Sequence, residues 1–337
     1  MAEESFKEYG KEEAIELLFE GSGFARTEQT VFETAPGSMV VSASRFFVEG
    51  IDFDLTYFPL KHLGYKCASA VTGELYASLA HPKTLSVRLG LSAKLDFSHV
   101  RELWSGVVAA AKEHGYKSLD LDLVPSPNGL AISMSAVGEE LKLTRGRKMK
   151  ARSKDLVCVS GSLGAAYLGQ QILEKEKRNF EKTTDDSAQP DLERYKMLIG
   201  SYLKPEIPSS AVERLEEVEI YPSHGYLVSH GLADTLKRLE RDSGLGVKVY
   251  ADKIPFEGNS FAFGKEMDID PVSAAMNGGD DFRLLFTIPI LSAEKFRREF
   301  QTFDIIGHLA QLEVGAVLVT PDGVELPVKA QGWNNEE

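Results

Sequence analysis

The stretch of residues 38–82 constrains the fold of this chain most strongly. It opens with small and β-branched residues that predict a strand. A helix is expected from Pro59, because apolar residues that include Cys67 recur after it at three- and four-residue spacing. Glu74 lies seven residues after Cys67, so it falls on this apolar stripe. A carboxylate on a buried stripe is costly unless it is paired or bound to a cation, and Glu74 therefore indicates a binding site.

The length and charge of the chain narrow the class of protein. With 337 residues the chain is too long for one ordinary core, so two domains are expected. The net charge of -13 works against nucleic acid or an anionic membrane as the main ligand. The acidic start is unlike a signal peptide, and no apolar run approaches the ~18 residues of a membrane-spanning helix. The only cysteines, Cys67 and Cys158, lie far apart in apolar segments. Buried reduced thiols are therefore expected, which indicates a cytoplasmic protein.

The two halves of the chain differ in their pattern of elements. The first half predicts an α+β domain whose sheet is covered on one face only. Its expected helices are 6–20, one from Pro59, and 97–114, and its expected strands are 30–34, 38–44, 84–91, 119–124 and 130–138. The second half alternates strands with helices, as a layered α/β domain does. Its expected strands include 155–160, 247–251 and 282–288. Its expected helices run from after 164 through Leu173, from after 231, at 271–276 and at 293–300. The fold class is therefore α/β.

A basic segment separates these halves. Its cationic residues are Lys142, Arg145, Arg147, Lys148, Lys150, Arg152 and Lys154. The segment is either a solvated linker or a means of attracting a phosphorylated ligand. We place the domain boundary here, which gives an N-terminal domain of residues 1–145 and a C-terminal domain of residues 146–337.

Four turns bear glycines or acids that could carry chemistry. They lie at 50–54, at 120–126, at 161–164 and at 278–281. Each alone is more often ordinary turn chemistry than a phosphate cradle. No Walker lysine follows any of them and no GxGxxG is present, so P-loop and dinucleotide-binding folds are disfavoured.

Taken in order along the chain, these turns form a more specific pattern. The matching segments are 40–41, 48–55, 63–66, Asp122 with 126–130, 136–139, 159–164, Ser229 with 231–233, 252–255, and 278–282 with 284–287. With them, nearly the whole chain resembles the thiamine-monophosphate kinases (ThiL-type), in the wider PurM-like superfamily of aminoimidazole-ribonucleotide synthetases. The resemblance implies a two-domain PurM-like fold and a homodimer whose N-terminal, ATP-binding domains pair their sheets into a barrel. It also implies in-line transfer of the γ-phosphoryl group of ATP to thiamine monophosphate, with Mg²⁺ held by carboxylates.

The resemblance also implies roles for individual residues. Asp122 and Asp281 are expected to be catalytic, and Glu74 and Asp122 are expected to bind metal. Nucleotide or substrate is expected at Arg45, Asp52, Gly161, Ser162, Gly164, Ser229, His230 and Asp280. The backbone of 161–164 would be available to phosphates.

Several of the family's aspartates are replaced here. Arg45, Ala165, Leu227 and His230 stand where the resemblance expects aspartate, and Glu74 keeps the charge of another. Arginine binds phosphate bidentately, so Arg45 and His230 could hold a phosphorylated ligand without metal. Alternatively, Arg45 pairs with Asp122 or Glu74 and fills an inactive site.

Three functions therefore stay open on the sequence. One is a thiamine-monophosphate kinase with a reduced metal set. Another is a catalytically degenerate relative that binds a phosphorylated small molecule or acts as a regulatory dimer. The last is an enzyme of the same superfamily with a different phosphorylated substrate.

Overall fold

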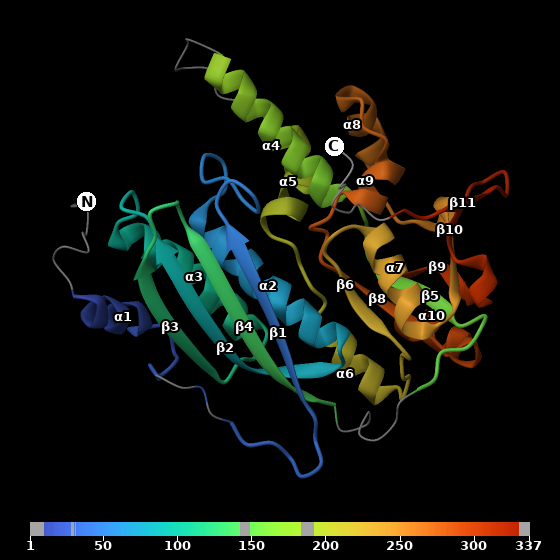
Figure 1. The fold of residues 1–337 in the computed structure, drawn as a ribbon, viewed down its shortest axis with the longest axis horizontal. Coiled ribbons are helices and arrows are strands. Elements are labelled where there is room, and N and C mark those ends of the chain that lie inside the picture. Colours follow the sequence, from blue (N-terminus) through green and yellow to red (C-terminus); the bar gives the residue numbers. More distant parts are fainter. Residues whose placement is uncertain (1–9, 28–29, 31, 142–148, 183–191, 330–337) are drawn as a thin grey trace. The chain divides into compact units, whose positions relative to one another are not determined.

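The chain is divided into two compact units, each built around one sheet. The computed structural model describes residues 10–27, 30, 32–141, 149–182 and 192–329. Its contacts separate Met1–Arg145 from Gly146–Glu337 (Figure 1). In this part of the chain, no helix is long and apolar enough to cross a membrane. Cys67 and Cys158 are both free and buried, as predicted.

The first unit is a four-stranded sheet with helices on one face (Figure 1). Its strands, in spatial order, are β1 (Val40–Val48), β4 (Ala131–Glu140), β2 (Ala80–Leu91) and β3 (Ser118–Pro125). β2 and β3 run parallel, and the other neighbours are antiparallel. Helices α2 (Leu60–Ala77) and α3 (Phe97–Glu113) form the layer on that face, and α1 (Lys11–Phe19) contacts the edge strand β3.

The two long helices of this unit pack unusually close together. A Cβ at Gly64 would lie 2.0 Å from the carbonyl oxygen of Leu103, and one at Gly106 would lie 1.9 Å from that of Lys61. Glycine therefore allows backbone to approach backbone at both positions. Asp96 starts α3 by accepting a hydrogen bond from the backbone N–H of His99 at 3.0 Å. These features hold α2 and α3 as one layer on the sheet.

The two faces of the first sheet differ in chemistry. The covered face is mainly apolar, and its residues Val87, Leu89, Ile132 and Met134 are fully buried. The opposite face carries Ser42, Ser44, Ser86, Ser133 and Ser135, which the register places side by side. The strand alternation thus confirms the expected sheet with one covered face.

The second unit is a seven-stranded mixed sheet in the order β11-β10-β7-β9-β5-β8-β6. Its strands are β5 (Leu156–Ser160), β6 (Gly225–Val228), β7 (Gly246–Tyr250), β8 (Arg283–Ile288), β9 (Phe303–Ala310), β10 (Ala316–Val319) and β11 (Glu325–Pro327). Its helices are α4 (Ala165–Lys182), α5 (Lys196–Leu203), α6 (Ser210–Glu217), α7 (Leu232–Ser243), α8 (Ser260–Met267), α9 (Pro271–Asn277) and α10 (Ala293–Glu299). Leu236 and Leu239 of α7 pack in a core with Val157, Val247 and Ile306 of the sheet.

The structure departs from the expected elements in two places. Residues 30 and 32–34 form no strand. The backbone N–H of Ala35, which follows them, donates a hydrogen bond to Oε1 of Glu139 at 2.8 Å and not to the backbone of a neighbouring strand. Helix α4 continues to Lys182, well beyond the expected end at Leu173, since the added turns are rich in the strong helix formers Glu and Lys.

Candidate functional site

Three turns of the second unit, far apart in sequence, lie against one another. We call them the loop cluster, defined as residues 161–164, 229–231 and 278–281. The N–H of Asp280 donates to the carbonyl oxygen of Ser229 at 2.9 Å, and the N–H of Gly164 donates to Oδ2 of Asp281 at 2.8 Å. The structure therefore brings together the seven site residues expected in this unit, namely Gly161, Ser162, Gly164, Ser229, His230, Asp280 and Asp281.

Asp281 stabilises the loop cluster through buried hydrogen bonds. Its carboxylate is buried and accepts hydrogen bonds from the N–H of Gly164 at 2.8 Å and of Ala166 at 3.2 Å. These donors belong to the first turn of α4, where an anion is favoured by the helix dipole. Burial nevertheless raises the pKa of Asp281 to about 7, against the lowering effect of the two hydrogen bonds. Both oxygens are thus engaged by backbone, and the catalytic role expected for Asp281 stays a prediction.

The phosphate cradle expected over 161–164 is corrected in part. The N–H of Leu163 donates to the carbonyl oxygen of Pro255 at 2.9 Å, and that of Gly164 donates to Asp281. These two donors are used inside the fold because they anchor the turn to neighbouring segments. Phosphate binding by Gly161 and Ser162 stays a prediction.

The glycines of the cluster are required by its close contacts. Gly231 has φ +87°, and a Cβ there would lie 2.4 Å from the carbonyl oxygen of Met276. Gly164 has φ +77°, and a Cβ there would lie 2.8 Å from the backbone nitrogen of Ala275. Both positions combine a left-handed backbone with a near neighbour, so only glycine fits without rearrangement. The glycine pattern seen in the sequence therefore reports packing between turns.

Polar side chains line part of this cluster. Ser229 is buried, and its Oγ lies 3.1 Å from Nδ1 of His230, whose side chain is exposed. Asp280 is half-buried in the left-handed region at φ +60°. By contrast, Leu227 and Ala165, which stand where the resemblance implies aspartate, lie in the apolar core at 0% and 1% exposure. Both side chains contribute to packing in this structure.

Sequence reasoning missed one residue that holds the cluster. Arg283, at the start of β8, donates from Nε to the carbonyl oxygen of Ser162 at 3.2 Å and from Nη1 to that of Glu206 at 3.1 Å. It thereby ties the 161–164 turn to the segment before α6. Its place two residues after Asp281 is the only sequence signal that could have drawn attention to it.

In the first unit, Asp122 lies on the uncovered face of the sheet. It sits on β3, paired in register with Arg88, and its Oδ1 lies 2.5 Å from Nζ of Lys11. The Lys11 ammonium lowers the pKa of Asp122 below its usual value. The carboxylate is thus ionised and already paired with a cation from α1.

Arg45 faces the opposite side. The register aligns Arg45 with Met134, Val87 and Leu121 in one row across the sheet. Paired residues share a face and successive residues alternate, so Asp122, next to Leu121, points away from Arg45. The Cζ of Arg45 lies 5.7 Å from the centre of the Phe47 ring. The proposed pairing of Arg45 with Asp122 is therefore wrong, whereas a pairing with Glu74 stays open.

The two expected metal ligands are also separated. Glu74 is half-buried on α2, which packs on the covered face, and Asp122 projects from the other face. These two carboxylates do not fit one shared Mg²⁺ ion. Within the described ranges, no group of three or more His, Cys, Asp or Glu side chains could hold a metal. Asp52 is exposed, and its Oδ2 accepts a hydrogen bond from the N–H of Val48 at 2.8 Å, so it shapes the turn after β1.

Comparison with known sequences points to one family of kinases, although no protein-family model matches the chain. It is 27% identical over 287 residues to the thiamine-monophosphate kinase of Aquifex aeolicus, which covers 85% of each protein. It is 26% identical over 300 residues to that of Methanospirillum hungatei, covering 88% of this chain and 89% of the relative. It is also 22% identical over 294 residues to a putative hydrogenase expression/formation protein of Methanocaldococcus jannaschii. The resemblance predicted from the motifs is confirmed.

Comparison with solved structures shows the fold. Thiamine monophosphate kinase from Aquifex aeolicus superposes with a TM-score of 0.71 at 24% identity, over 95% of this chain and 99% of that one. AaThiL complexed with AMPPCP and TMP superposes with a TM-score of 0.70 at 22% identity, over 97% of both chains. The hydrogenase maturation protein HypE in complex with ATP gives 0.66 at 18% identity, over 92% of this chain and 89% of that one. These neighbours have the PurM-like fold, so the predicted fold is confirmed.

Proposed function

We propose that this protein transfers the γ-phosphoryl group of ATP to thiamine monophosphate, giving thiamine diphosphate. One observation carries the proposal: the similarity to thiamine-monophosphate kinases spans 85% of both chains in the Aquifex aeolicus pair. The solved relative bound to AMPPCP and TMP supports the same pair of ligands.

The loop cluster is the part of the chain that we assign to ligand phosphates. Phosphoryl transfer depends mainly on positioning and on stabilisation of charge, so a rigidly held cluster with polar side chains at its edge is suited to it. Asp281 and the glycines of the cluster hold the turns in place, and His230 and Ser229 present polar atoms at its edge. In this proposal Asp281 positions the helix start, and His230 contacts the substrate phosphate.

Mg²⁺ and ATP are the expected cofactors. Mg²⁺ is commonly held by substrate phosphates, water and only one or two carboxylates. Because Glu74 and Asp122 do not fit one ion, any Mg²⁺ would arrive with the nucleotide and meet at most one of them. When bound, it would neutralise charge on the phosphates.

A catalytically degenerate relative is the second candidate. The specific observation in its favour is that the carboxylates of the first unit are dispersed: Asp122 is paired with Lys11, while Glu74 lies with α2 on the other side of the sheet. Such a protein would bind ATP or thiamine monophosphate without turning them over.

The test is to incubate the purified protein with Mg²⁺, ATP and thiamine monophosphate and to quantify thiamine diphosphate. We expect steady formation of product, and a rate at least about tenfold lower for His230→Ala. His224→Ala is the matched control, because His224 lies just before β6 and His230 shortly after it. The control is expected to keep the wild-type rate. An unchanged rate for His230→Ala would show that His230 does not contact the substrate phosphate, and no product from the wild type would refute the kinase.

Melting temperatures separate the two candidates. A ligand at 100 times its dissociation constant stabilises a protein by about 2.7 kcal/mol. A shift with either ligand but no thiamine diphosphate would support the degenerate relative. No shift with ATP would count against the kinase, and no shift with either ligand would count against both.

We further propose a homodimer in the cytoplasm. The uncovered face of the first sheet exposes Phe46 at 62% and Val40 at 54%, among serines, and an apolar and small-residue surface of this kind suits pairing with a second copy. The pair of reduced cysteines fits the cytoplasm. Sedimentation equilibrium should give a dimer for the wild type and a monomer for Phe46→Glu; a wild-type monomer would refute the dimer.

A further inference from the structure

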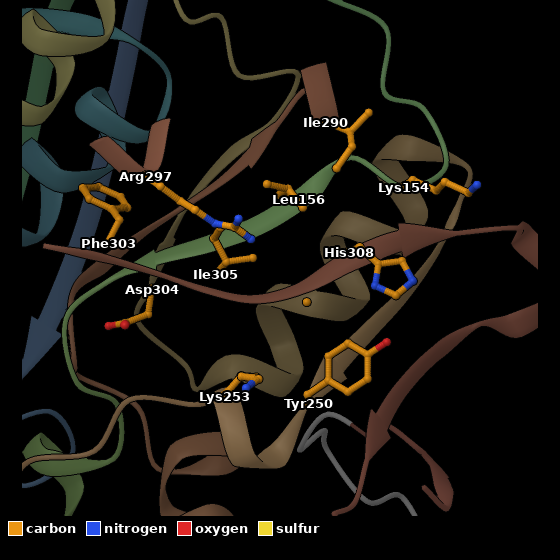
Figure 2. A pocket seen from close by; sticks show the side chains of 11 residues that line it. Lys154, Leu156, Tyr250, Lys253, Ile290, Arg297, Phe303, Asp304, Ile305 and His308 are labelled. Carbon is orange, nitrogen blue, oxygen red and sulfur yellow. The ribbon is translucent and has the colours of Figure 1, made fainter. Parts of the chain in front are cut away.

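A cavity of ligand size lies in the second unit and shares no residue with the loop cluster. Its volume is about 710 Å³, within the range of about 300–1,000 Å³ that is typical of small-molecule sites. It opens over strands β5, β7 and β9, with α10 at its edge (Figure 2). Nothing in the proposed kinase reaction uses it.

An irregularity in β9 builds the floor of this cavity. Leu156 pairs with His308 and Cys158 pairs with Ile305, so β9 contains one residue more than β5 between these pairs. Such a bulge turns Ile305 and His308 to the same face, although an odd spacing would otherwise place them on opposite faces. Both line the cavity. Bulges that re-aim side chains are common next to functional sites.

The charge around the cavity is opposite to that of the whole protein. Lys154, Lys253 and Arg297 line it, against the single acid Asp304, in a chain of net charge -13. Lys253 lies 3.8 Å from Asp252, whereas no ion pair within the described ranges involves Lys154 or Arg297. Figure 2 shows the Arg297 guanidinium extending over Ile305. Guanidinium binds phosphate bidentately.

An aromatic pair lies on the other side of the same cavity. The rings of Tyr250 and His308 are stacked, with centroids 5.9 Å apart and an interplanar angle of 28° (Figure 2). Leu156 and Ile305 add apolar surface between this pair and Arg297. A ring on the ligand would therefore find flat and apolar partners while its anionic group reached the cations.

We propose that this cavity binds a phosphorylated small molecule that carries a planar ring, at a site separate from the loop cluster. Arg297 would hold the phosphate, Lys253 and Lys154 would add positive charge at two other edges of the cavity, and the Tyr250–His308 pair would contact the ring. The basic segment of the sequence contributes Lys154 to the lining of this cavity. The site is independent of the proposed kinase reaction.

Calorimetric titration of the full-length protein with pyridoxine 5′-phosphate tests the site. The titration is done without Mg²⁺, and unphosphorylated pyridoxine serves as the comparison ligand. We expect saturable binding of the phosphorylated probe at one site per chain and much weaker binding of pyridoxine. Arg297→Ala should raise the dissociation constant at least about tenfold, since it removes a charge-assisted contact.

Arg298→Ala is the matched control. Arg298 is the next residue on α10, is 72% exposed and pairs with Glu299, and it does not line the cavity. Its removal changes the net charge equally and should leave binding unchanged. Tyr250→Leu should weaken binding of pyridoxine 5′-phosphate, which has a ring, but not binding of inorganic pyrophosphate, which has none.

Two results would overturn the proposal. One is no binding of pyridoxine 5′-phosphate up to roughly 10 mM. The other is an equal loss in Arg297→Ala and Arg298→Ala, or no loss in either. Turnover of thiamine monophosphate by Arg297→Ala is measured in parallel and should match the wild type, so failure of this site and failure of the kinase proposal are distinguishable.

Discussion

The two units of this protein treat their expected site residues in opposite ways. In the second unit, residues from three distant segments meet within hydrogen-bond distance around Asp281. In the first unit, Arg45 and Asp122 lie on opposite faces of one sheet, and Asp122 is paired with Lys11. Glycine turns report backbone contacts that the fold must satisfy, whereas the partner of a charged side chain depends on strand register. The difference explains why the glycine motifs located a cluster in the second unit and the acidic residues of the first unit did not.

The largest expected effect concerns Asp281, whose carboxylate accepts two backbone hydrogen bonds in the loop cluster. Asp281→Ala removes the acceptor for two backbone N–H groups at the start of α4. Each buried N–H group left without an acceptor lowers the free energy of unfolding by about 1–3 kcal/mol. We expect the free energy of unfolding to fall by about 4 kcal/mol at pH 5, measured by calorimetry. Asp252→Asn, at an exposed aspartate of the same unit, should change it by less than about 0.5 kcal/mol. Similar losses in both variants would contradict the assignment of Asp281.

The pH dependence of stability sharpens the same point. Burial raises the pKa of folded Asp281 to about 7 from 3.8. Between these values the folded protein holds a proton that the unfolded chain has lost, so this contribution to stability decreases as the pH rises from about 4 to about 7. Relative to Asp281→Asn, the wild type should lose about 3 kcal/mol over this range. Parallel stability curves for the two proteins would show that Asp281 titrates normally.

The close approach of the turns can be tested with glycine variants. Gly231→Ala places a Cβ 2.4 Å from the carbonyl oxygen of Met276 at φ +87°, and should destabilise the second unit by about 2–3 kcal/mol. Gly200→Ala in α5 is the control, because a Cβ there has nothing within 4 Å and Ala favours helix by up to about 1 kcal/mol. Opposite signs are expected in thermal melts; destabilisation by both would break the argument.

The smallest expected effect is in the first unit. The Lys11–Asp122 pair has side chains that are 49% and 40% exposed. Solvent screens such pairs, so Lys11→Ala should cost less than about 1 kcal/mol and the cost should shrink in high salt. A double-mutant cycle with Asp122→Asn measures the coupling. A coupling above about 2 kcal/mol would mean that this pair matters as much as the loop cluster does.

Most of the architecture followed from sequence patterns, and most of the side-chain geometry did not. Helices α2 and α3 and the strands around them were predictable because apolar periodicity and caps such as Asp96 act locally. The extension of α4 to Lys182 was not predictable from apolar periodicity, because the added turns depend on the helix propensity of Glu and Lys. The partner of Asp122 was hidden, because Lys11 lies 111 positions earlier and reaches it only through packing of α1. The role of Asp281 was likewise hidden, because no fixed sequence spacing relates a buried carboxylate to the start of a helix that lies far away in the chain.

The separation of Glu74 from Asp122 is tested most directly by a metal titration. Mn²⁺, an electron-paramagnetic substitute for Mg²⁺, is titrated into the protein without nucleotide, for the wild type, Glu74→Gln and Asp122→Asn. Because the sheet divides the two carboxylates, we predict no Mn²⁺ site tighter than about 0.1 mM, and the same weak binding in all three proteins. A tight site in the wild type that is lost in both variants would contradict this account.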